Sequence, residues 1–308
     1  MSIEGRGSIV DRISNVVRHR LLAAELRRMR TEAHLSGPLV AKDLGMSPAK
    51  FSRLESASVK PSATDIQALL NYYGVPAAKQ GGYLTLARQS SEYGWWDNHA
   101  KMLPAPFVNY IGLEHEAKVM INWETLVLPG LLQTESYMDV INRVGLEFLR
   151  MKPSWVKLRS TVRLTRQSLL TCPNPLQFIA VMDEAVIHRA IATLRNAGGS
   201  DLVREQLSHL ISMARLPNVT VRIIRLWQPY SLFARAMVLL RFGAVDAVPG
   251  LVHPDVIFEE SVAGGSVTDT EDETYQIDQL LDSLIHVSLD PHESLRLLQQ
   301  QLADENDN

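Results

Sequence analysis

The stretch VAKDLGMSPAKFSRLES, residues 40–56, decides how the N-terminal region folds. Gly45 permits the positive φ angle of a tight turn, and Ser47 followed by Pro48 is typical of a helix start. The small Ala41 stands where two helices would approach each other closely. Apolar residues recur on both sides of the turn at the offsets that bury one face of each helix: Val40, Leu44, Met46, Phe51 and Leu54. The stretch therefore predicts two short helices that cross at a turn.

Further helices are expected on both sides of this pair. Residues 21–29 carry leucines and a methionine near helical spacing, before a stop at Leu35-Ser36-Gly37. Pro61-Ser62 begins another helix that ends at Gly74, and a fifth segment lies around Tyr83. The predicted parts of this half are a flexible N-terminus, residues 1–11; an all-α bundle, residues 12–90; and a linker, residues 91–106, rich in turn residues.

Charge is distributed unevenly along the chain. From Arg12 to Lys60 there are ten basic and four acidic residues, a formal charge of +6. From Gly243 to the end there are fifteen acidic residues and a single base, Arg296, a charge of −14, although the whole chain has a net charge of only −3. The basic region favours a polyanionic partner at that end. The alternative interpretation is that the basic and the acidic region are both ordinary solvent-exposed surfaces that bind no charged partner.

The segment from Leu35-Ser36 through Leu54-Glu55 resembles the Xre or Cro-repressor class of helix-turn-helix proteins. The helix before it and Lys60-Pro61-Ser62 after it match that class too. The resemblance implies that the second helix of the pair docks into the major groove of double-stranded DNA. The alternative is a helix pair of the same spacing in an ordinary bundle. Carried over position by position, the candidate DNA-binding residues are Ser47, Pro48, Ala49, Lys50, Ser52 and Arg53.

The chemistry of these candidates is uneven. Arg53 alone has the fork that grips guanine O6 and N7 in a bidentate manner, whereas Pro48 and Ala49 offer only contacts to thymine methyl groups. Lys50 suits a phosphate or a base. The sequence also departs from the family, which often has a phosphate-holding glutamine where Gly37 stands and a glycine where Ser56 stands. The candidate phosphate contacts are Arg27, Arg30, Gly37, Ser56 and Lys60.

After the linker the pattern alternates between strand and helix. Segments rich in β-branched and apolar residues are expected to be strands, at 118–127, 176–182, 219–226, 236–242 and 256–258. Helical patterns lie between and after them, at 134–144, 154–170, 201–214, 275–286 and 291–302. The expected fold is therefore multidomain, with an all-α helix-turn-helix bundle followed by a mixed α/β effector or partner-binding domain with one main sheet. That domain is predicted at residues 107–302, with an acidic tail at 303–308.

The second half carries a resemblance of its own. Asn122-Trp123-Glu124 and LPGLLQTESY, residues 128–137, resemble the opening of the C-terminal domain of actinomycete WhiJ-like regulators. Residues 163–167, MDEAVIHR at 182–189 and LPNV at 216–219 match its later blocks. The resemblance implies an antitoxin-like repressor, commonly encoded beside a small partner protein, whose C-terminal domain senses that partner or an effector. The candidate effector or partner contacts are Trp123, Glu124, Gln133, Glu135, Tyr137, Arg163, Asp183 and Glu184. A purely structural role is the alternative for PGLLQTESY, since Thr134 caps a predicted helix.

Composition and motifs narrow the class of protein. A single cysteine, Cys172, favours a reducing compartment, and no apolar run approaches the roughly 20 residues that cross a bilayer. We therefore expect a cytoplasmic, nucleoid-associated protein that needs no membrane. No cofactor or metal is expected, because there is neither a phosphate-binding glycine loop nor a pair of histidines at metal-ligand spacing. Asp183-Glu184 with His188 is the strongest acid–base pair, but a surface hydrogen bond is the more common role for such a pair.

The sequence thus predicts a sequence-specific DNA-binding transcriptional regulator, a repressor rather than an enzyme. A homodimer is expected, because one short helix covers only a few base pairs. The rival hypothesis is a protein-interaction module, antitoxin-like, whose helix-turn-helix no longer reads DNA specifically. A further hypothesis is that the acidic C-terminal region competes with DNA for the basic N-terminal region.

Overall fold

The computed structural model describes residues 15–90, 94–149, 153–230, 235–244, 248, 250–261 and 265–307. The chain forms two compact units, Met1–Asn98 with Gly243–His253 and His99–Phe242 with Pro254–Asn308. The predicted flexible N-terminus, residues 1–11, lies outside the described residues. Of the predicted linker, residues 91–106, three residues lie outside them too, and the rest contains the 3-10 helix η1 (Trp95–His99) and the start of the helix α6.

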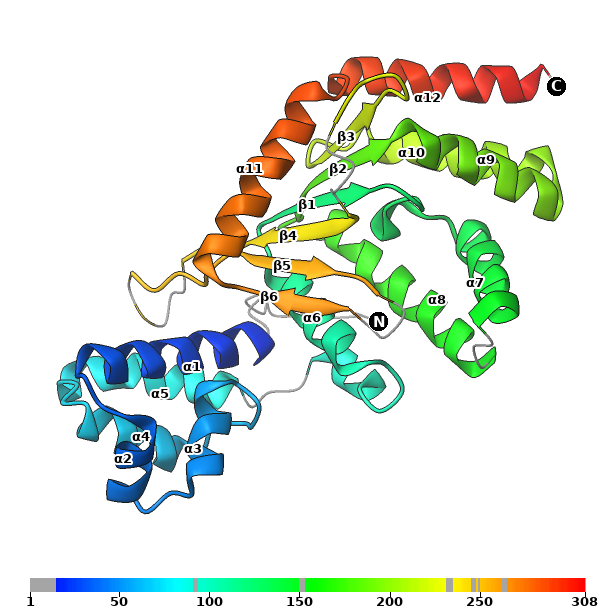
Figure 1. Ribbon diagram of the computed structural model, residues 1–308. Coiled ribbons are helices and arrows are strands. Elements are labelled where there is room, and N and C mark those ends of the chain that lie inside the picture. Colours follow the sequence, from blue (N-terminus) through cyan, green and yellow to red (C-terminus); the bar gives the residue numbers. More distant parts are fainter. Residues whose placement is uncertain are drawn as a thin grey trace, which may run out of the picture. The chain divides into compact units, whose positions relative to one another are not determined.

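The first unit is all-α, as predicted. Within its described residues the α-helices, seen in blue to cyan in Figure 1, are α1 (Asn15–Glu32), α2 (Gly37–Asp43), α3 (Pro48–Glu55), α4 (Ala63–Tyr72) and α5 (Ala77–Gln89). Three of these helices begin at a serine whose hydroxyl accepts a backbone N–H three residues on. The clearest case is Ser47, whose Oγ lies 3.2 Å from the amide nitrogen of Lys50. The predicted helix start at Ser47-Pro48 is therefore confirmed.

The predicted apolar anchors build the core of this unit. Val40, Phe51 and Leu54 are at most 3% exposed and pack with Leu22, Leu26 and the apolar face of α4. Leu44 and Met46 are partly buried against the same cluster. Ala41 is fully buried, and Gly45 has a φ of +64°, so the turn between α2 and α3 uses the glycine as predicted.

A short segment from later in the chain belongs to the first unit. Leu251 and Val248 pack against Leu21 and Leu86 in a small apolar cluster. The sequence placed this segment inside a continuous second domain, residues 107–302. Among its described residues, the regular structure is a single β-bridge between Ala244 and Val252. The segment therefore has no helical or strand periodicity by which it could have been assigned to the first unit from the sequence.

The second unit is built on one mixed sheet of six strands among its described residues, in the order β3-β2-β1-β4-β5-β6. β1 and β2, and β2 and β3, are parallel, whereas the other neighbours are antiparallel. The strands are β1 (Val119–Glu124), β2 (Gln177–Asp183), β3 (Val219–Ile224), β4 (Met237–Arg241), β5 (Val256–Glu259) and β6 (Ser266–Thr268). Each of the five predicted strands is present. The sixth, β6, was missed because three residues are too few for an alternation to show.

Helices cover both faces of this sheet. They are α6 (Ala105–Glu116), α7 (Glu135–Leu149), α8 (Pro153–Gln167), α9 (Glu184–Gly198), α10 (Ser200–Met213), α11 (Glu271–Val287) and α12 (Pro291–Asn306), with the 3-10 turns η2 (Gly130–Leu132) and η3 (Ser168–Leu170). The predicted acidic tail, residues 303–308, is therefore helical as far as Asn306. The predicted helical segments left out α6, which is buried on nearly all sides and so lacks an amphipathic stripe, and also α9. Among the described residues, no helix combines the length and apolar character that crossing a membrane requires.

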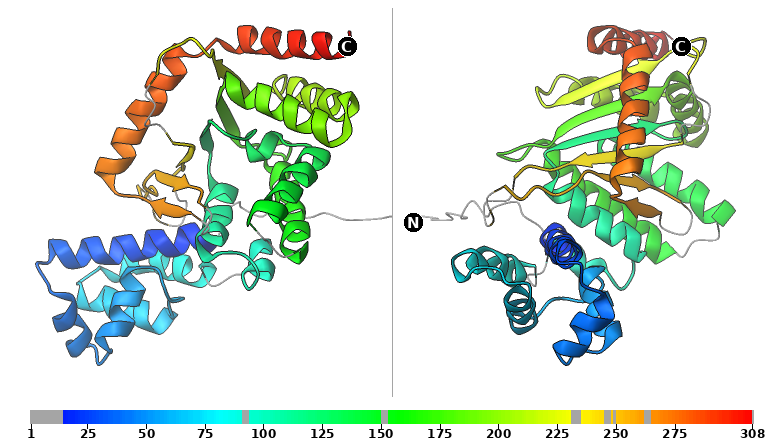
Figure 2. Two further views of the ribbon diagram at one scale, coloured as in Figure 1. Left: turned by 45° about the vertical axis from the view of Figure 1, so that its right-hand side comes forward. Right: turned by 60° about the vertical axis from the view of Figure 1, so that its left-hand side comes forward.

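Helix α11, in orange, crosses one face of the sheet (Figure 2). Successive side chains of a strand point to opposite faces. Ile121 and Trp123 of β1 pack with Leu281 and Leu284 of α11 on one face. On β5, Ile257 joins that cluster, whereas the neighbouring Phe258 stacks on Tyr110 of α6 with ring centroids 4.1 Å apart. The side chains that alternate with the α11 cluster therefore point to the α6 side.

Candidate nucleic-acid interface and a pocket in the second unit

Helix α3 has one buried and one exposed face. Phe51, Leu54 and Glu55 are buried, whereas Ser47 and five residues of α3 and its C-cap are exposed. The exposed set contains the predicted base contacts apart from Lys50, and the predicted phosphate contact Ser56: Ser47, Pro48, Ala49, Ser52, Arg53 and Ser56. Helical spacing therefore brings these side chains together on one surface.

Arg53 and Lys50 differ in how far they are already engaged. The Nε of Arg53 donates to the Ala49 carbonyl oxygen at 3.2 Å, and its terminal nitrogens have no partner among the described residues. The Nζ of Lys50 lies 2.8 Å from the carboxylate of Asp65 at the start of α4. Burial alone would raise the pKa of Asp65, but hydrogen bonds from Lys50 and Ser62 outweigh it and lower that pKa. A DNA contact by Lys50 would compete with this ion pair.

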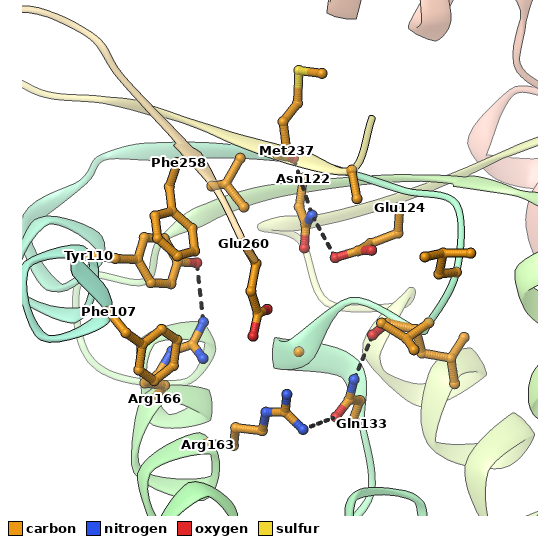
Figure 3. Close-up of a pocket in the computed structure, with 16 residues that line it drawn as sticks. Phe107, Tyr110, Asn122, Glu124, Gln133, Arg163, Arg166, Met237, Phe258 and Glu260 are labelled. Carbon is orange, nitrogen blue, oxygen red and sulfur yellow. Dashed lines mark hydrogen bonds between the residues drawn. The ribbon is translucent and has the colours of Figure 1, made fainter. Parts of the chain in front are cut away.

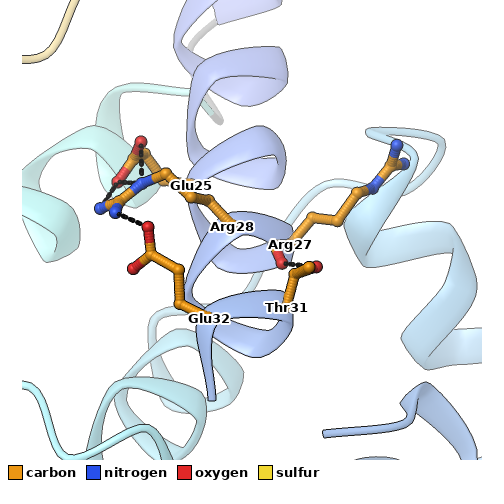
Figure 4. Close-up of polar contacts among 5 residues, drawn as sticks. All are labelled: Glu25, Arg27, Arg28, Thr31 and Glu32. Carbon is orange, nitrogen blue, oxygen red and sulfur yellow. Dashed lines mark hydrogen bonds and ion pairs between the residues drawn. The ribbon is translucent and has the colours of Figure 1, made fainter. Parts of the chain in front are cut away.

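The arginines of α1 contact protein groups (Figure 4). Arg28 lies between Glu25 and Glu32, and Arg27 extends away from that cluster and donates to the Glu55 carbonyl oxygen at 2.8 Å. Arg30 forms a bidentate pair with the Glu55 carboxylate, at 2.8 and 3.0 Å, and also donates to the Leu35 carbonyl oxygen at 2.9 Å. Arg27 and Arg30, predicted as phosphate contacts, thus fasten α1 to the end of α3. Phosphate binding by Arg30 would require it to release Glu55.

The remaining predicted phosphate contacts lie at the ends of helices. A Cβ at Gly37 would come within 3.1 Å of the Phe51 ring, so close packing of α2 on α3 explains why glycine stands there. Ser56 caps the C-terminus of α3, and its Oγ is 2.8 Å from that of Ser58. Lys60 is exposed in the loop before α4.

The predicted effector contacts divide into three groups. Trp123, Tyr137, Asp183 and Glu184 are buried and make structural contacts; Asp183, for example, caps α9 and accepts a hydrogen bond from Tyr230 at 2.6 Å. Glu184 lies 3.7 Å from the imidazole of His188 and also accepts the N–H of Leu226, so the suspected acid–base pair is part of the fold contacts. Glu135 is exposed at the start of α7. Glu124, Gln133 and Arg163 come together at a pocket.

This pocket has a volume of about 230 Å³ and lies on the α6 side of the sheet (Figure 3). Its polar side chains come from strand β1, the C-cap of η2, helix α8 and the residue after β5, and are Asn122, Glu124, Gln133, Arg163, Arg166 and Glu260. Asn122 donates to Glu124 at 3.3 Å, and Arg163 donates to the Gln133 carboxamide oxygen at 3.2 Å. Apolar walls are supplied by Phe107, Leu126, Leu128, Val238 and Phe258 among others.

Ion pairs occupy most of the charges around the pocket. Arg166 makes two bonds of 2.6 Å to the fully buried carboxylate of Glu114, and Arg159 lies 2.8 Å from Glu260. Burial raises the pKa of Glu124 to about 8, and burial with the nearby charge of Arg159 lowers the pKa of Arg163 to about 10. The surroundings of the pocket therefore disfavour the charged form of both Glu124 and Arg163.

Sequence reasoning missed several pocket residues. Asn122 and Arg166 stand inside two of the blocks quoted for the second half, Asn122-Trp123-Glu124 and residues 163–167, which was the available signal. Glu260 and Tyr110 gave no such signal, because they lie far from those blocks in sequence and only the sheet brings them near.

Comparison with known families matches both units. Residues 21–80 match a model described as a helix-turn-helix domain, which is typical of DNA-binding regulators. Residues 107–300 match a domain of unknown function, DUF5753. No curated protein and no solved structure matches the chain. Because the second match covers more than half of the residues, the chain belongs to the DUF5753 family, here with a helix-turn-helix domain before it.

Proposed function

We propose that this protein is a sequence-specific transcriptional regulator, a repressor of the Xre or Cro type, that places α3 in the major groove of DNA. The observation that carries the proposal is the exposed face of α3, on which Arg53 keeps its terminal nitrogens for a ligand. Ser47 and Ser52 add hydroxyl groups, and Pro48 and Ala49 fit thymine methyl groups. The poor hydrogen-bonding capacity of this face predicts a strong reliance on Arg53 and on contacts to phosphate.

The same proposal gives roles to the rest of the molecule. The protein acts at the nucleoid as a homodimer, because one α3 spans too few base pairs for specificity and two half-sites supply the rest. The second unit makes it a WhiJ-like regulator that senses an effector or a small protein encoded nearby. It is not an enzyme: the support is that Asp183 and Glu184, the strongest acid–base candidates, are engaged in capping α9 and binding backbone.

The deciding experiment is selection of binding sites from random duplex DNA with the purified full chain, with and without the product of the neighbouring gene. A reader of DNA yields two half-sites about one helical turn apart. Titration of the selected site by fluorescence anisotropy over a range of salt should show a steep fall in affinity as salt rises, and a clear preference over random duplex.

Two variants sharpen that titration. Arg53→Ala should weaken the selected site roughly 5- to 150-fold and relax the preference at one base position. Arg88→Ala, which removes an exposed arginine from α5, is the matched control and should leave the preference unchanged. Lys50→Ala is expected to weaken all sequences alike. Weak binding that is blind to sequence and unaffected by Arg53→Ala would favour the rival hypothesis, an interaction module that no longer reads DNA.

A further inference from the structure

We propose that the pocket of the second unit binds a small organic acid, with the carboxylate of the ligand on Arg163 and its apolar body against Leu126, Leu128 and Val238. The sensing role of the second unit, part of the proposed function, gives this binding its biological meaning. The binding itself rests on the geometry of the pocket.

Arg163 forms no ion pair among the described residues, although the charge of Glu260, which also lines the pocket, acts to raise its pKa. Its guanidinium donates to the neutral carboxamide of Gln133, and no carboxylate lies within 4.0 Å of it among the residues described. The two arginines one turn away on α8 are satisfied, since Arg159 pairs with Glu260 and Arg166 with Glu114. The Arg163 side chain is half-buried, so its guanidinium has lost part of its contact with water, and a ligand carboxylate compensates for that loss with a charge-assisted pair.

The Gln133 contact holds Arg163 toward the cavity (Figure 3). The amide nitrogen of Gln133 donates to the Leu128 carbonyl oxygen at 2.6 Å, so its carboxamide is fixed and its oxygen is turned to Arg163. The guanidinium is therefore positioned before any ligand arrives. Because the side chain is preorganised, binding a ligand costs less conformational entropy.

The opposite wall favours an anion as well. Glu124 faces the cavity with Asn122 bonded to it, and because its pKa is about 8 its carboxyl is mostly protonated at neutral pH. With Glu124 neutral, the other charged groups that line the cavity are Arg163, Arg166 and Glu260, and of these Arg166 and Glu260 are in ion pairs.

Size and lining limit the ligand to a short acid. A volume of about 230 Å³ corresponds to roughly eight waters. The walls include aromatic and aliphatic side chains, with Leu126, 62% exposed, and Glu260 at the rim. An aliphatic or aromatic monocarboxylate fits this combination of one cation, one neutral acid and apolar surface.

The test compares three probes of equal length by calorimetric titration into the full chain: hexanoate, hexanamide and hexylamine. Hexanoate should bind about tenfold or more tightly than hexanamide, because only the carboxylate neutralises Arg163. Arg163→Gln should abolish that preference. Arg143→Gln is the matched control and should keep it, because Arg143 is exposed on α7 and, within the described part of the chain, hydrogen bonds to the Asp139 carbonyl oxygen of its own helix.

Equal binding of hexanoate and hexanamide, a preference for hexylamine, or no binding of hexanoate would overturn the inference, and the unaltered chain alone decides this if Arg163→Gln does not fold. An Arg163→Gln protein that folds and still prefers hexanoate would overturn it too. Anisotropy with the selected DNA in the same samples separates the two proposals. A chain that binds DNA but no acid refutes only the pocket ligand, whereas a chain that binds hexanoate but no DNA refutes only the regulator.

Discussion

Glu55 is the point at which α1 is fastened to the candidate recognition helix, so Glu55→Ala should destabilise the first unit specifically. The carboxylate of Glu55 is 9% exposed and its partner Arg30 is 20% exposed. The substitution removes two charge-assisted bonds and leaves the guanidinium with the Leu35 carbonyl oxygen. Breaking a fully buried pair costs about 3–5 kcal/mol. Because the side chain of Arg30 is still partly exposed to water, we expect the free energy of unfolding of the first unit to fall by about 2–3 kcal/mol.

Hydrogen exchange measured by mass spectrometry resolves the effect by location. A loss of this size accelerates exchange of amides that open with the first unit by about 30- to 150-fold. Peptides from the sheet of the second unit should exchange at their original rate. The backbone carbonyl of Glu55 remains, so the bond from Arg27 survives and the loss measures the side-chain pair.

The matched control is Glu32→Ala, which removes a glutamate of the same helix bundle from an exposed pair. The Glu32 side chain is 62% exposed and lies 2.6 Å from Arg28 (Figure 4). Such surface pairs contribute about 0.2–1 kcal/mol, so exchange should change by a factor of about five at most. Equal effects of Glu55→Ala and Glu32→Ala would show that the α1–α3 contact is no clamp, and the reasoning would be wrong.

Three further substitutions test other contacts. Ser47→Ala removes the N-cap of α3 and should destabilise that helix by about 1 kcal/mol, seen as faster hydrogen exchange of its amides. Ser52→Ala on the same exposed face should have little effect on that exchange. Arg166→Met leaves the fully buried Glu114 without its cation and should lower the free energy of unfolding of the second unit by about 3–5 kcal/mol, measured by urea denaturation. The double variant Arg166→Met, Glu114→Leu should recover part of that loss. Glu124→Gln should remove a pH dependence. The pKa of Glu124 is about 8 in the folded chain and about 4.5 in the unfolded chain, so the folded chain binds the extra proton and its stability falls as pH rises from about 4.5 to 8. If the difference in unfolding free energy between the original chain and Glu124→Gln does not change over this pH range, the assignment is wrong.

The first unit was predictable because its signals are local. Ser47 capping α3, Gly45 in the turn and the anchors Val40, Phe51 and Leu54 each act within a few residues of where they stand. The roles of Arg27 and Arg30 were not predictable in this way. Their partner Glu55 lies 25 or more residues away, and a basic residue on a helix has the same pattern whether it meets a phosphate or a carboxylate.

In the second unit, β-branched and apolar composition predicted five strands, whereas helical periodicity did not reveal α6. α6 is buried on nearly every side, so its apolar residues form no stripe, although Tyr110 and Glu114 on it decide which arginine of α8 is neutralised. The pocket was found only in part, through Glu124, Gln133 and Arg163. Its other carboxylate, Glu260, follows β5 and reaches the site through sheet order alone.

Helix α8 shows why the charge of the pocket is a tertiary property. Arg159, Arg163 and Arg166 recur at four- and three-residue spacing, so the sequence places them on one face of a helix. Nothing in that spacing distinguishes them. Two different elements supply acids to the outer two, Glu260 after β5 and Glu114 on α6, and the middle arginine receives a neutral amide from η2's C-cap, Gln133. A glutamate at position 133 would form an ion pair with Arg163. Because the residue there is a neutral glutamine, the guanidinium of Arg163 remains available to the carboxylate of a ligand. Gln133→Glu should therefore eliminate the preference for hexanoate although Arg163 is retained. The substitution also removes the N–H that donates to the Leu128 carbonyl oxygen, so the result counts only if circular dichroism shows that the variant is folded.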